Sequence, residues 1–174
     1  MGASARSIGS GPEREGSIAI SYDLTIERLL DAPPELVFDT IVDASAQEEI
    51  YAGVVEGWSL KSFEIDLRVG GSWRFEFGPP EGEGPADLVS QVFTEVDRPR
   101  RLAYQGSMFV SGWGRTVEYE EAISFEDQGG KTLLTLTMSG LEREADRDAF
   151  GGGVPSYVDS LKQAVEARAA RTAR

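Results

Sequence analysis

The stretch of sequence that decides the fold is FEIDLRVGGSWRFEF, residues 63–77. Apolar and charged residues alternate on both sides of Gly70-Gly71, and a period of two is typical of β-strands with one buried face. A Gly-Gly pair between two such runs is a common two-residue hairpin turn. The stretch therefore predicts an antiparallel hairpin whose buried face consists mainly of Phe63, Trp73, Phe75 and Phe77.

The same alternation continues on both sides of this hairpin. Strands are predicted from it at residues 22–28, 89–96, 102–105, 116–126 and 132–139. Turn signals separate the strands, among them Asp97-Arg98-Pro99 and Asp127-Gln128-Gly129-Gly130. Consecutive strands joined by short turns form an antiparallel sheet, so the chain predicts one sheet of about seven strands.

Two short helices are predicted between the first strand and the hairpin. Pro34 and Glu35 favour a helix N-terminus, and apolar residues follow at helical spacing up to Val42. Ser45-Ala46-Gln47-Glu48 is a candidate capping box that opens the second helix, and this helix should end near Gly53.

The C-terminal part predicts two helices separated by glycines. Residues 142–150 form the first helix. Gly151-Gly152-Gly153 interrupts it, because a glycine in a helix interior costs about 1 kcal/mol against alanine. A longer helix follows from Pro155 and carries one apolar stripe, Val158, Leu161 and Val165. This stripe has to pack against one face of the sheet.

These elements predict an α+β fold in a single domain over residues 18–170. Residues 1–17 are rich in Gly, Ser and Arg, which predicts a disordered tail, and residues 171–174 are expected to fray. The first residues carry no secretory signal, and no apolar run is long enough to span a membrane. We therefore expect a cytoplasmic location.

The composition excludes several classes of active site. The 174 residues include no His and no Cys, which removes Ser-His-Asp triads, cysteine nucleophiles and ordinary zinc sites. Carboxylates alone can hold Mg²⁺ or Ca²⁺, but we expect no resident metal and no cofactor. The formal charge of −13 argues against binding to nucleic acid or to an anionic membrane surface.

Five stretches also carry a family likeness, namely residues 31–39, 63–73, 95–104, 129–137 and 156–161. Together they resemble the Bet v 1/START-like (SRPBCC) superfamily and, within it, the activator of Hsp90 ATPase homologue 1-like (AHSA1) domain family. The resemblance implies the helix-grip fold, a curved antiparallel sheet wrapped around a long C-terminal helix with a cavity between them. Two places differ: Ile50-Tyr51 and Gly153-Val154-Pro155 stand where many members carry tryptophan.

In such a fold, the inward side chains of the sheet either line a ligand cavity or fill the core. The ligand-binding candidates are Phe63, Trp73, Phe75, Phe77, Gln91, Phe93, Tyr104, Tyr119, Glu121, Tyr157 and Leu161. Glu121 shares a strand face with Tyr119, and an apolar pocket would raise its pKa and fit it for acid–base work or for holding a polar ligand group. The alternative for Glu121 is a bulge that turns the carboxylate into water, so it is only a weak catalytic candidate.

Residues 106–114 are predicted to form a glycine-bounded loop with three large apolar side chains, Met108, Phe109 and Trp113. Exposed loops seldom carry so much apolar surface without a role. These three residues are lid candidates for the cavity. A homodimer interface and simple packing onto the core are the alternatives.

Three functions follow as hypotheses. The first is binding of a small hydrophobic or amphipathic molecule in the cavity. The second is an enzyme of the cyclase or dehydratase type, in which a carboxylate and a tyrosine of the cavity perform acid–base catalysis. The third, implied by the family name, is a co-chaperone-like role on an Hsp90-type ATPase.

Overall fold

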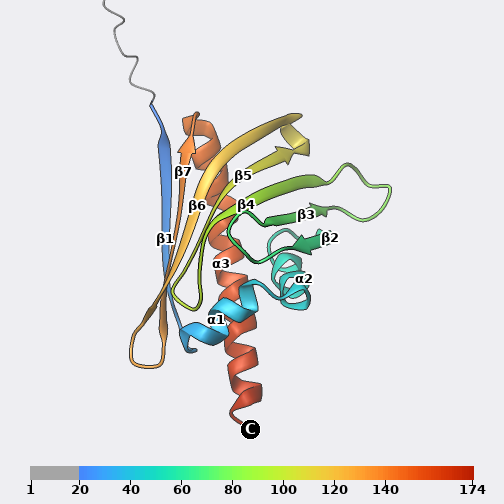
Figure 1. Cartoon of the computed structure of the whole chain (residues 1–174). Coiled ribbons are helices and arrows are strands. Elements are labelled where there is room, and N and C mark those ends of the chain that lie inside the picture. Colours follow the sequence, from blue (N-terminus) through green and yellow to red (C-terminus); the bar gives the residue numbers. More distant parts are fainter. Residues whose placement is uncertain (1–19) are drawn as a thin grey trace, which may run out of the picture.

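The computed structural model describes residues 20–174 and confirms the α+β helix-grip fold (Figure 1). One antiparallel sheet has the strand order β1-β7-β6-β5-β4-β3-β2. Its strands are β1 (Tyr22–Leu30), β2 (Ser59–Ile65), β3 (Ser72–Gly78), β4 (Asp87–Asp97), β5 (Arg101–Val110), β6 (Arg115–Asp127) and β7 (Thr132–Leu141). The helices are α1 (Pro34–Ile41), α2 (Ala44–Ala52) and α3 (Glu144–Thr172), and a single 3-10 turn, η1 (Ser111–Trp113), joins β5 to β6. The tail predicted over residues 1–17 lies outside the described residues.

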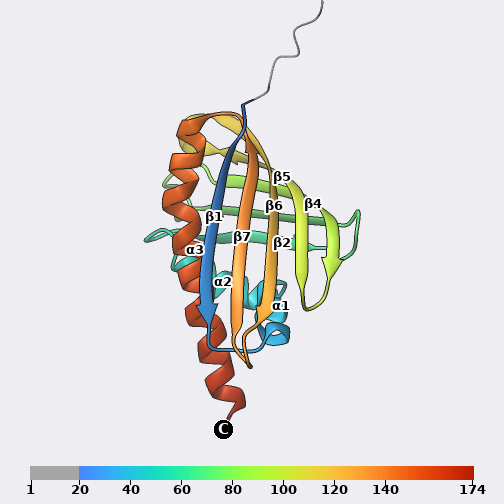
Figure 2. The same ribbon diagram turned by 90° about the vertical axis from the view of Figure 1, so that its left-hand side faces the viewer.

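The sheet curves around α3, which runs along its concave side, while α1 and α2 close one end (Figure 1). Figure 2 shows β1, β7 and β6 face-on, with α3 beside them. The core lies between these layers and includes the fully buried side chains of Phe38, Ile50 and Leu134, one each from α1, α2 and β7. Removal of this apolar surface from water is the main driving force that holds the sheet against the helices.

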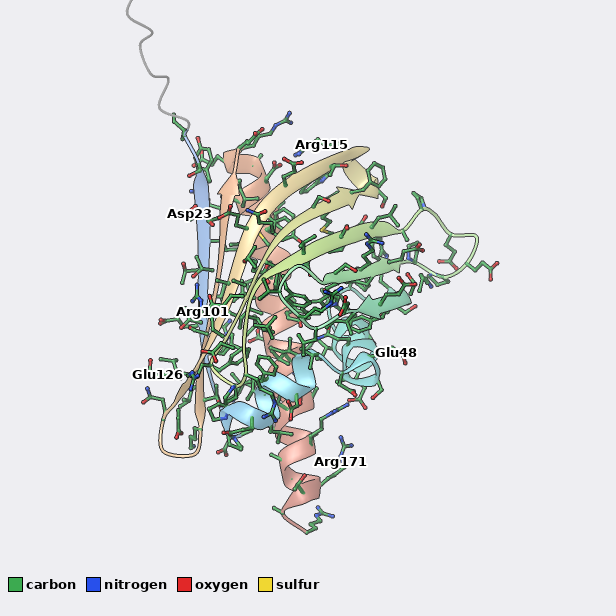
Figure 3. The ribbon with its side chains drawn as sticks, in the orientation of Figure 1. Asp23, Glu48, Arg101, Arg115, Glu126 and Arg171 are labelled. Atoms are coloured by element: carbon green, nitrogen blue, oxygen red, sulfur yellow. The ribbon has the colours of Figure 1, made fainter. Side chains whose placement is uncertain are left out.

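The charged side chains occupy the outside of this arrangement. Asp23, Glu48, Arg101 and Glu126 are exposed and point away from the body of the domain (Figure 3). Within residues 20–174, no helix is both long and apolar enough to cross a membrane.

The hairpin that contains Gly70-Gly71 forms, but its predicted two-residue turn is wrong. Strand β2 already ends at Ile65, and residues 66–71 make the connection to β3. The two glycines pair with the neighbouring strand instead: the Gly70 amide donates to the Phe93 carbonyl at 2.8 Å, and the Phe93 amide donates to the Gly71 carbonyl at 3.0 Å. A Cβ atom at Gly71 would lie 2.0 Å from the Asp66 carbonyl oxygen, so glycine is needed for this close approach.

The capping box at Ser45-Ala46-Gln47-Glu48 is also wrong. Asp43 is the N-cap of α2, and its side chain accepts a hydrogen bond from the Ala46 amide at 2.8 Å. Ser45 lies inside the helix, and its hydroxyl donates to the Asp43 carboxylate at 2.7 Å. A helix that starts two residues earlier uses the better acceptor, because a carboxylate also interacts favourably with the helix dipole.

The predicted break at Gly151-Gly152-Gly153 does not exist, because α3 runs without interruption from Glu144 to Thr172 with Pro155 inside it. Packing on both sides outweighs the poor helix propensity of this stretch. Phe150 packs against the core before the glycines, and Val154 and Tyr157 do so after them. One continuous helix therefore carries these side chains across the concave face.

The predicted loop at residues 106–114 is mostly a strand. Strand β5 continues to Val110, and η1 with Gly114 makes the connection to β6. Gly106 and Ser107 do not interrupt the strand, because the whole segment pairs in regular register with β4 and β6.

Candidate functional site

A cavity of about 310 Å³ lies between the concave face of the sheet and the helices. Side chains from β3 to β7 form one wall, Tyr51 of α2 and the segment after it form a second, and the N-terminal half of α3 forms a third. Most lining side chains are aliphatic or aromatic. The acids and amides among them are Asp87, Gln91 and Glu121, so a few polar groups face an apolar space, as in many small-molecule sites.

The cavity brings together most of the ligand-binding candidates from the sequence. Those that line it are Trp73, Phe75, Phe77, Gln91, Tyr104, Tyr119, Glu121 and Tyr157. The other three do not line it. Phe93 and Leu161 are buried in the core, and Phe63 packs edge-on against Trp73 with the ring centroids 6.0 Å apart.

The three lid candidates separate between the two faces of the sheet. Met108 and Trp113 line the cavity. Phe109 does not, because adjacent residues of a strand point to opposite faces. Its strand partners are Leu88 of β4 and Thr116 of β6, beside which it lies on the convex face.

Glu121 points into the cavity because β6 has no bulge. The register of β6 with β5 and with β7 is regular through this position, where Glu121 stands opposite Tyr104 and Met138. Side chains at alternate positions, Tyr119 and Ile123, are buried on the same face, whereas Glu120 is exposed on the other. The sequence alone left open whether the Glu121 carboxylate faces water.

The carboxyl group of Glu121 belongs to a cluster of four polar side chains. The Tyr104 hydroxyl donates a hydrogen bond to Glu121 Oε1. Close by, Gln91 Nε2 donates to the Tyr119 hydroxyl oxygen at 2.9 Å. Gln91 is only 5% exposed, and its Oε1 atom has no hydrogen-bond partner among the described residues. The indole Nε1 of Trp73, which is 3% exposed, also has none there.

Burial raises the pKa of Glu121 to about 7, although the hydrogen bond from Tyr104 acts in the opposite direction. A carboxyl group with this pKa exchanges its proton near neutral pH. Burial also raises the pKa values of Tyr104, Tyr119 and Tyr157 well above the ordinary tyrosine value, so these hydroxyl groups keep their protons. The cavity therefore contains a group that can give or take a proton, surrounded by neutral hydroxyl groups.

Gly106 makes room for the Tyr119 ring. The two residues are paired across β5 and β6, and a Cβ atom at Gly106 would lie 2.7 Å from Tyr119 Cζ. This distance is far below a van der Waals contact, so the ring lies where any other residue at position 106 would place its side chain. The glycine thereby allows the Tyr119 hydroxyl to lie beside Gln91.

Comparison with known proteins decides the family. The family described as "Activator of Hsp90 ATPase homolog 1-like protein" matches residues 31–166, which is most of the chain. The protein belongs to the activator of Hsp90 ATPase homologue 1-like family. The resemblance seen in the sequence is thus confirmed. No curated protein matches the chain.

Solved structures with the same fold include several bacterial proteins. One from Chromobacterium violaceum has 22% sequence identity and a TM-score of 0.71, over 83% of this chain and 96% of that one. One from Rhizobium loti has 22% identity and a TM-score of 0.69, over 83% and 97% of the two chains. A third, from Nitrosomonas europaea, has 21% identity and a TM-score of 0.69, over 84% and 95%. At these identities the likeness supports the fold of this family member and nothing finer.

The two places where this family member lacks the expected tryptophans both lie at the cavity. Tyr51 lines it and packs against Phe75, Phe77 and Tyr157, with ring centroids 5.0 to 5.3 Å apart. Gly153 and Val154 line it from α3, and a Cβ atom at Gly153 would meet no atom within 4 Å. At these two places the cavity wall therefore consists of Tyr51, Gly153 and Val154.

Two polar contacts around the cavity were not predicted from the sequence. The first contact joins α2 to Tyr157 of the cavity wall. Gln47 of α2 is buried, and its Nε2 donates to the Ile41 carbonyl at 2.6 Å and to the Tyr157 hydroxyl at 3.0 Å. A buried glutamine partnered by a tyrosine 110 residues away leaves no local pattern in the sequence.

The second contact lies at the start of α3, beside η1. Asp146 is buried and pairs with the Arg115 guanidinium, which also lies over the Trp113 ring at 4.9 Å. Trp113 in turn packs edge-on against Phe150, with the ring centroids 6.2 Å apart. Trp113 and Phe150 both line the cavity. The ion pair between Arg115 and Asp146 therefore holds the end of the cavity that lies between η1 and α3.

The described residues hold no group of three or more acidic side chains arranged for a metal ion. The Asp87 carboxylate is occupied by η1, since its Oδ1 accepts hydrogen bonds from the Ser111 amide and hydroxyl, both at 2.7 Å. Both carboxyl groups of the cavity therefore have one oxygen that accepts a hydrogen bond from the protein, Asp87 Oδ1 from η1 and Glu121 Oε1 from Tyr104, and a second oxygen without a partner among the described residues. The arrangement can bind an amphipathic molecule and can exchange one proton with it.

Proposed function

We propose that this protein binds a small hydrophobic or amphipathic molecule in the cavity of the helix-grip fold. An apolar cavity of about 310 Å³ has room for a ligand of two or three fused rings or a short chain. Aromatic side chains from β3, α2 and α3 provide the surface that such a ligand would remove from water.

One observation carries this proposal: unpaired polar atoms are buried at the cavity wall. Gln91 Oε1 and Trp73 Nε1 lack partners among the described residues, and leaving a buried polar atom unpaired costs about 1 to 3 kcal/mol. Native proteins rarely tolerate this cost without a reason. A ligand with a polar end near Glu121 would supply the missing hydrogen bonds and regain part of that free energy.

Binding can be tested by a thermal-shift screen of amphipathic and aromatic compounds, followed by titration calorimetry of the hits. A ligand that binds only the native state raises the melting temperature by mass action. The variant Met108→Trp places a larger side chain in the cavity and should weaken binding at least tenfold.

The matched control is Phe109→Trp on the adjacent position of the same strand, which faces the convex side. It should bind as the natural protein does. Equal loss of binding in both variants, or a broad screen without any shift, would contradict the proposal.

A second candidate function is acid–base catalysis, favoured by the pKa of about 7 at Glu121. A carboxyl group with this pKa is suited to remove a proton from a bound substrate and to return it, and Tyr104 holds the group in place by its hydrogen bond. Glu121→Gln would abolish turnover of a substrate while leaving the fold intact. Turnover that survives this substitution would exclude a cyclase or dehydratase reaction through Glu121.

The co-chaperone role stays a prediction drawn from the family name. It would use an outer surface to bind an Hsp90-type ATPase, so cavity variants such as Met108→Trp should leave it unchanged. Titration calorimetry with such an ATPase at tens of micromolar tests it, and absence of heat there would remove this candidate.

A further inference from the structure

The described residues give the cavity acidic side chains but no basic ones. Among the described residues that line it, two carry carboxyl groups, Asp87 and Glu121, and none is Lys or Arg. The nearby Arg115 does not line the cavity, and its guanidinium is already paired with Asp146. A ligand carboxylate would therefore lose its hydration without meeting a compensating charge, which is costly in an apolar space.

The hydrogen-bonding groups of the cavity also favour a positively charged ligand group over a carboxylate. The strongest acceptors are the carboxyl groups of Asp87 and Glu121. Each has one oxygen that accepts from the protein, and at Glu121 the donor is the Tyr104 hydroxyl. Gln91 Oε1 adds another acceptor without a partner. Trp73 Nε1 and the Tyr119 hydroxyl are donors, but both are neutral. A polar group that donates several hydrogen bonds and carries positive charge fits these acceptors best.

Aromatic rings complete this environment. Tyr51 of α2 packs against Phe77 of β3 and Tyr157 of α3, and Trp58 packs on Phe77 with the ring centroids 5.1 Å apart. All four residues line the cavity. The faces of aromatic rings attract cations, by about 0.5 to 2 kcal/mol for each well-placed contact.

Resting on the proposed function, we infer that the ligand is an apolar molecule with a protonated amine at its polar end, and that the cavity discriminates against carboxylates. The amine donates to Glu121 and to Gln91 Oε1, while the apolar body of the ligand packs against the aromatic wall.

The pH dependence of binding follows from the groups that face Glu121. These are Tyr104 of β5, Tyr119 of β6, Tyr51 of α2 and Tyr157 of α3, all with raised pKa values and hence neutral, and Met138 of β7. Asp87 of β4 lines the same cavity.

With a pKa of about 7, the ionised fraction of Glu121 rises from about a tenth at pH 6 to about nine-tenths at pH 8. Amine affinity should therefore rise about tenfold over this range. Carboxylate affinity should fall, because a protonated Glu121 can donate to the carboxylate and an ionised one repels it.

The test uses three probes with the same ring system: 2-(1-naphthyl)ethylamine, 2-(1-naphthyl)ethanol and 1-naphthylacetate. Titration calorimetry at pH 6, 7 and 8 measures their affinities for the full chain. The expected order at pH 8 is amine, then alcohol, then carboxylate, and the amine and carboxylate should respond to pH in opposite directions.

Two variants separate the role of Glu121 from the general acidity of the protein. Glu121→Gln should reduce amine affinity at pH 8 about tenfold, leave the alcohol nearly unchanged and remove the pH dependence of both charged probes. Glu120→Gln removes the adjacent, exposed carboxylate on the convex side and should change none of these values. If Glu121→Gln does not fold, the opposite pH responses of the two charged probes still decide the question.

The outcomes distinguish the two proposals. Carboxylate binding as tight as amine binding at pH 8, blocked by Met108→Trp, would overturn the amine inference and leave ligand binding standing. Absence of binding for all three probes would overturn the amine inference. Absence of any hit in the broader screen as well would overturn the proposed function.

Discussion

Replacing Glu121 with glutamine should change how the stability of the protein depends on pH. Burial raises the pKa of this carboxyl group from 4.5 to about 7, so the folded state holds the proton more tightly than the unfolded state does. The stabilising contribution is present in full below pH 4.5 and is lost as the pH rises through about 7. Glutamine does not titrate, and its side-chain oxygen can still accept the hydrogen bond from Tyr104.

The magnitude follows from the two pKa values. Each tenfold change in proton affinity is worth about 1.4 kcal/mol, so a rise from 4.5 to about 7 corresponds to about 3 kcal/mol. About 2.5 kcal/mol of this is lost between pH 5 and pH 8. Over that interval, the free energy of unfolding of the natural protein should fall by about 2.5 kcal/mol relative to Glu121→Gln.

Urea unfolding followed by circular dichroism at pH 5, 6, 7 and 8 measures this difference. Comparing the natural protein with the variant cancels the titration of the other acidic residues, and Glu120→Gln serves as the exposed control. A difference that stays constant within about 0.5 kcal/mol from pH 5 to pH 8 would refute the burial of Glu121. An equal pH dependence in the Glu120→Gln comparison would refute its assignment to this residue.

Three further substitutions test the fold around the cavity, each by urea unfolding. Gly106→Ala places a Cβ atom 2.7 Å from Tyr119 Cζ and should lower the free energy of unfolding by about 1 to 3 kcal/mol. In the control Gly112→Ala, the added Cβ atom meets no atom within 4 Å, so stability should change little. Equal effects of the two substitutions would contradict the close approach of Tyr119 to Gly106. Gly152→Ala should stabilise the protein by about 0.5 to 1 kcal/mol because α3 is continuous there, and destabilisation would indicate a break. Asp43→Ala should cost about 1 kcal/mol through loss of the N-cap of α2, and no change would argue for a different helix start.

The sheet could be predicted from the sequence because it depends on local alternation, and alternation made an inward position of Glu121 one of two alternatives. A strand with a regular register places every second side chain on one face, so Glu121 has to share the buried face of Tyr119 and Ile123. Alternation cannot exclude a bulge, however, and bulges are set by neighbouring strands. Only the pairing of β6 with both of its neighbours settled this point.

The wrong predictions of turns and helix breaks have a different physical origin, since each comes from a local rule that tertiary contacts outweigh. Glycines favour breaks and turns when considered alone. Gly152 nevertheless lies in a helix that is held by packing before and after it, and Gly70 pairs with Phe93 of β4 instead of turning. In both cases the partners are distant in the sequence, so no window of local sequence contains the information.

Because the sequence contains no histidine, proton exchange in the cavity near neutral pH depends on another side chain. Histidine is the usual side chain that changes charge between pH 5 and pH 8, and this protein has none. The tyrosines of the cavity keep their protons because burial raises their pKa values, while burial brings Glu121 to about 7. The half-buried carboxyl group of Glu121 thus has the role that histidine has in other proteins, but with the opposite charge, because it is mostly neutral below pH 7 and mostly negative above it. Any ligand that this cavity binds or transforms in a pH-dependent manner near neutrality should therefore respond to the appearance of a negative charge, and Glu121→Gln should abolish that response whether the protein is a binding protein or an enzyme.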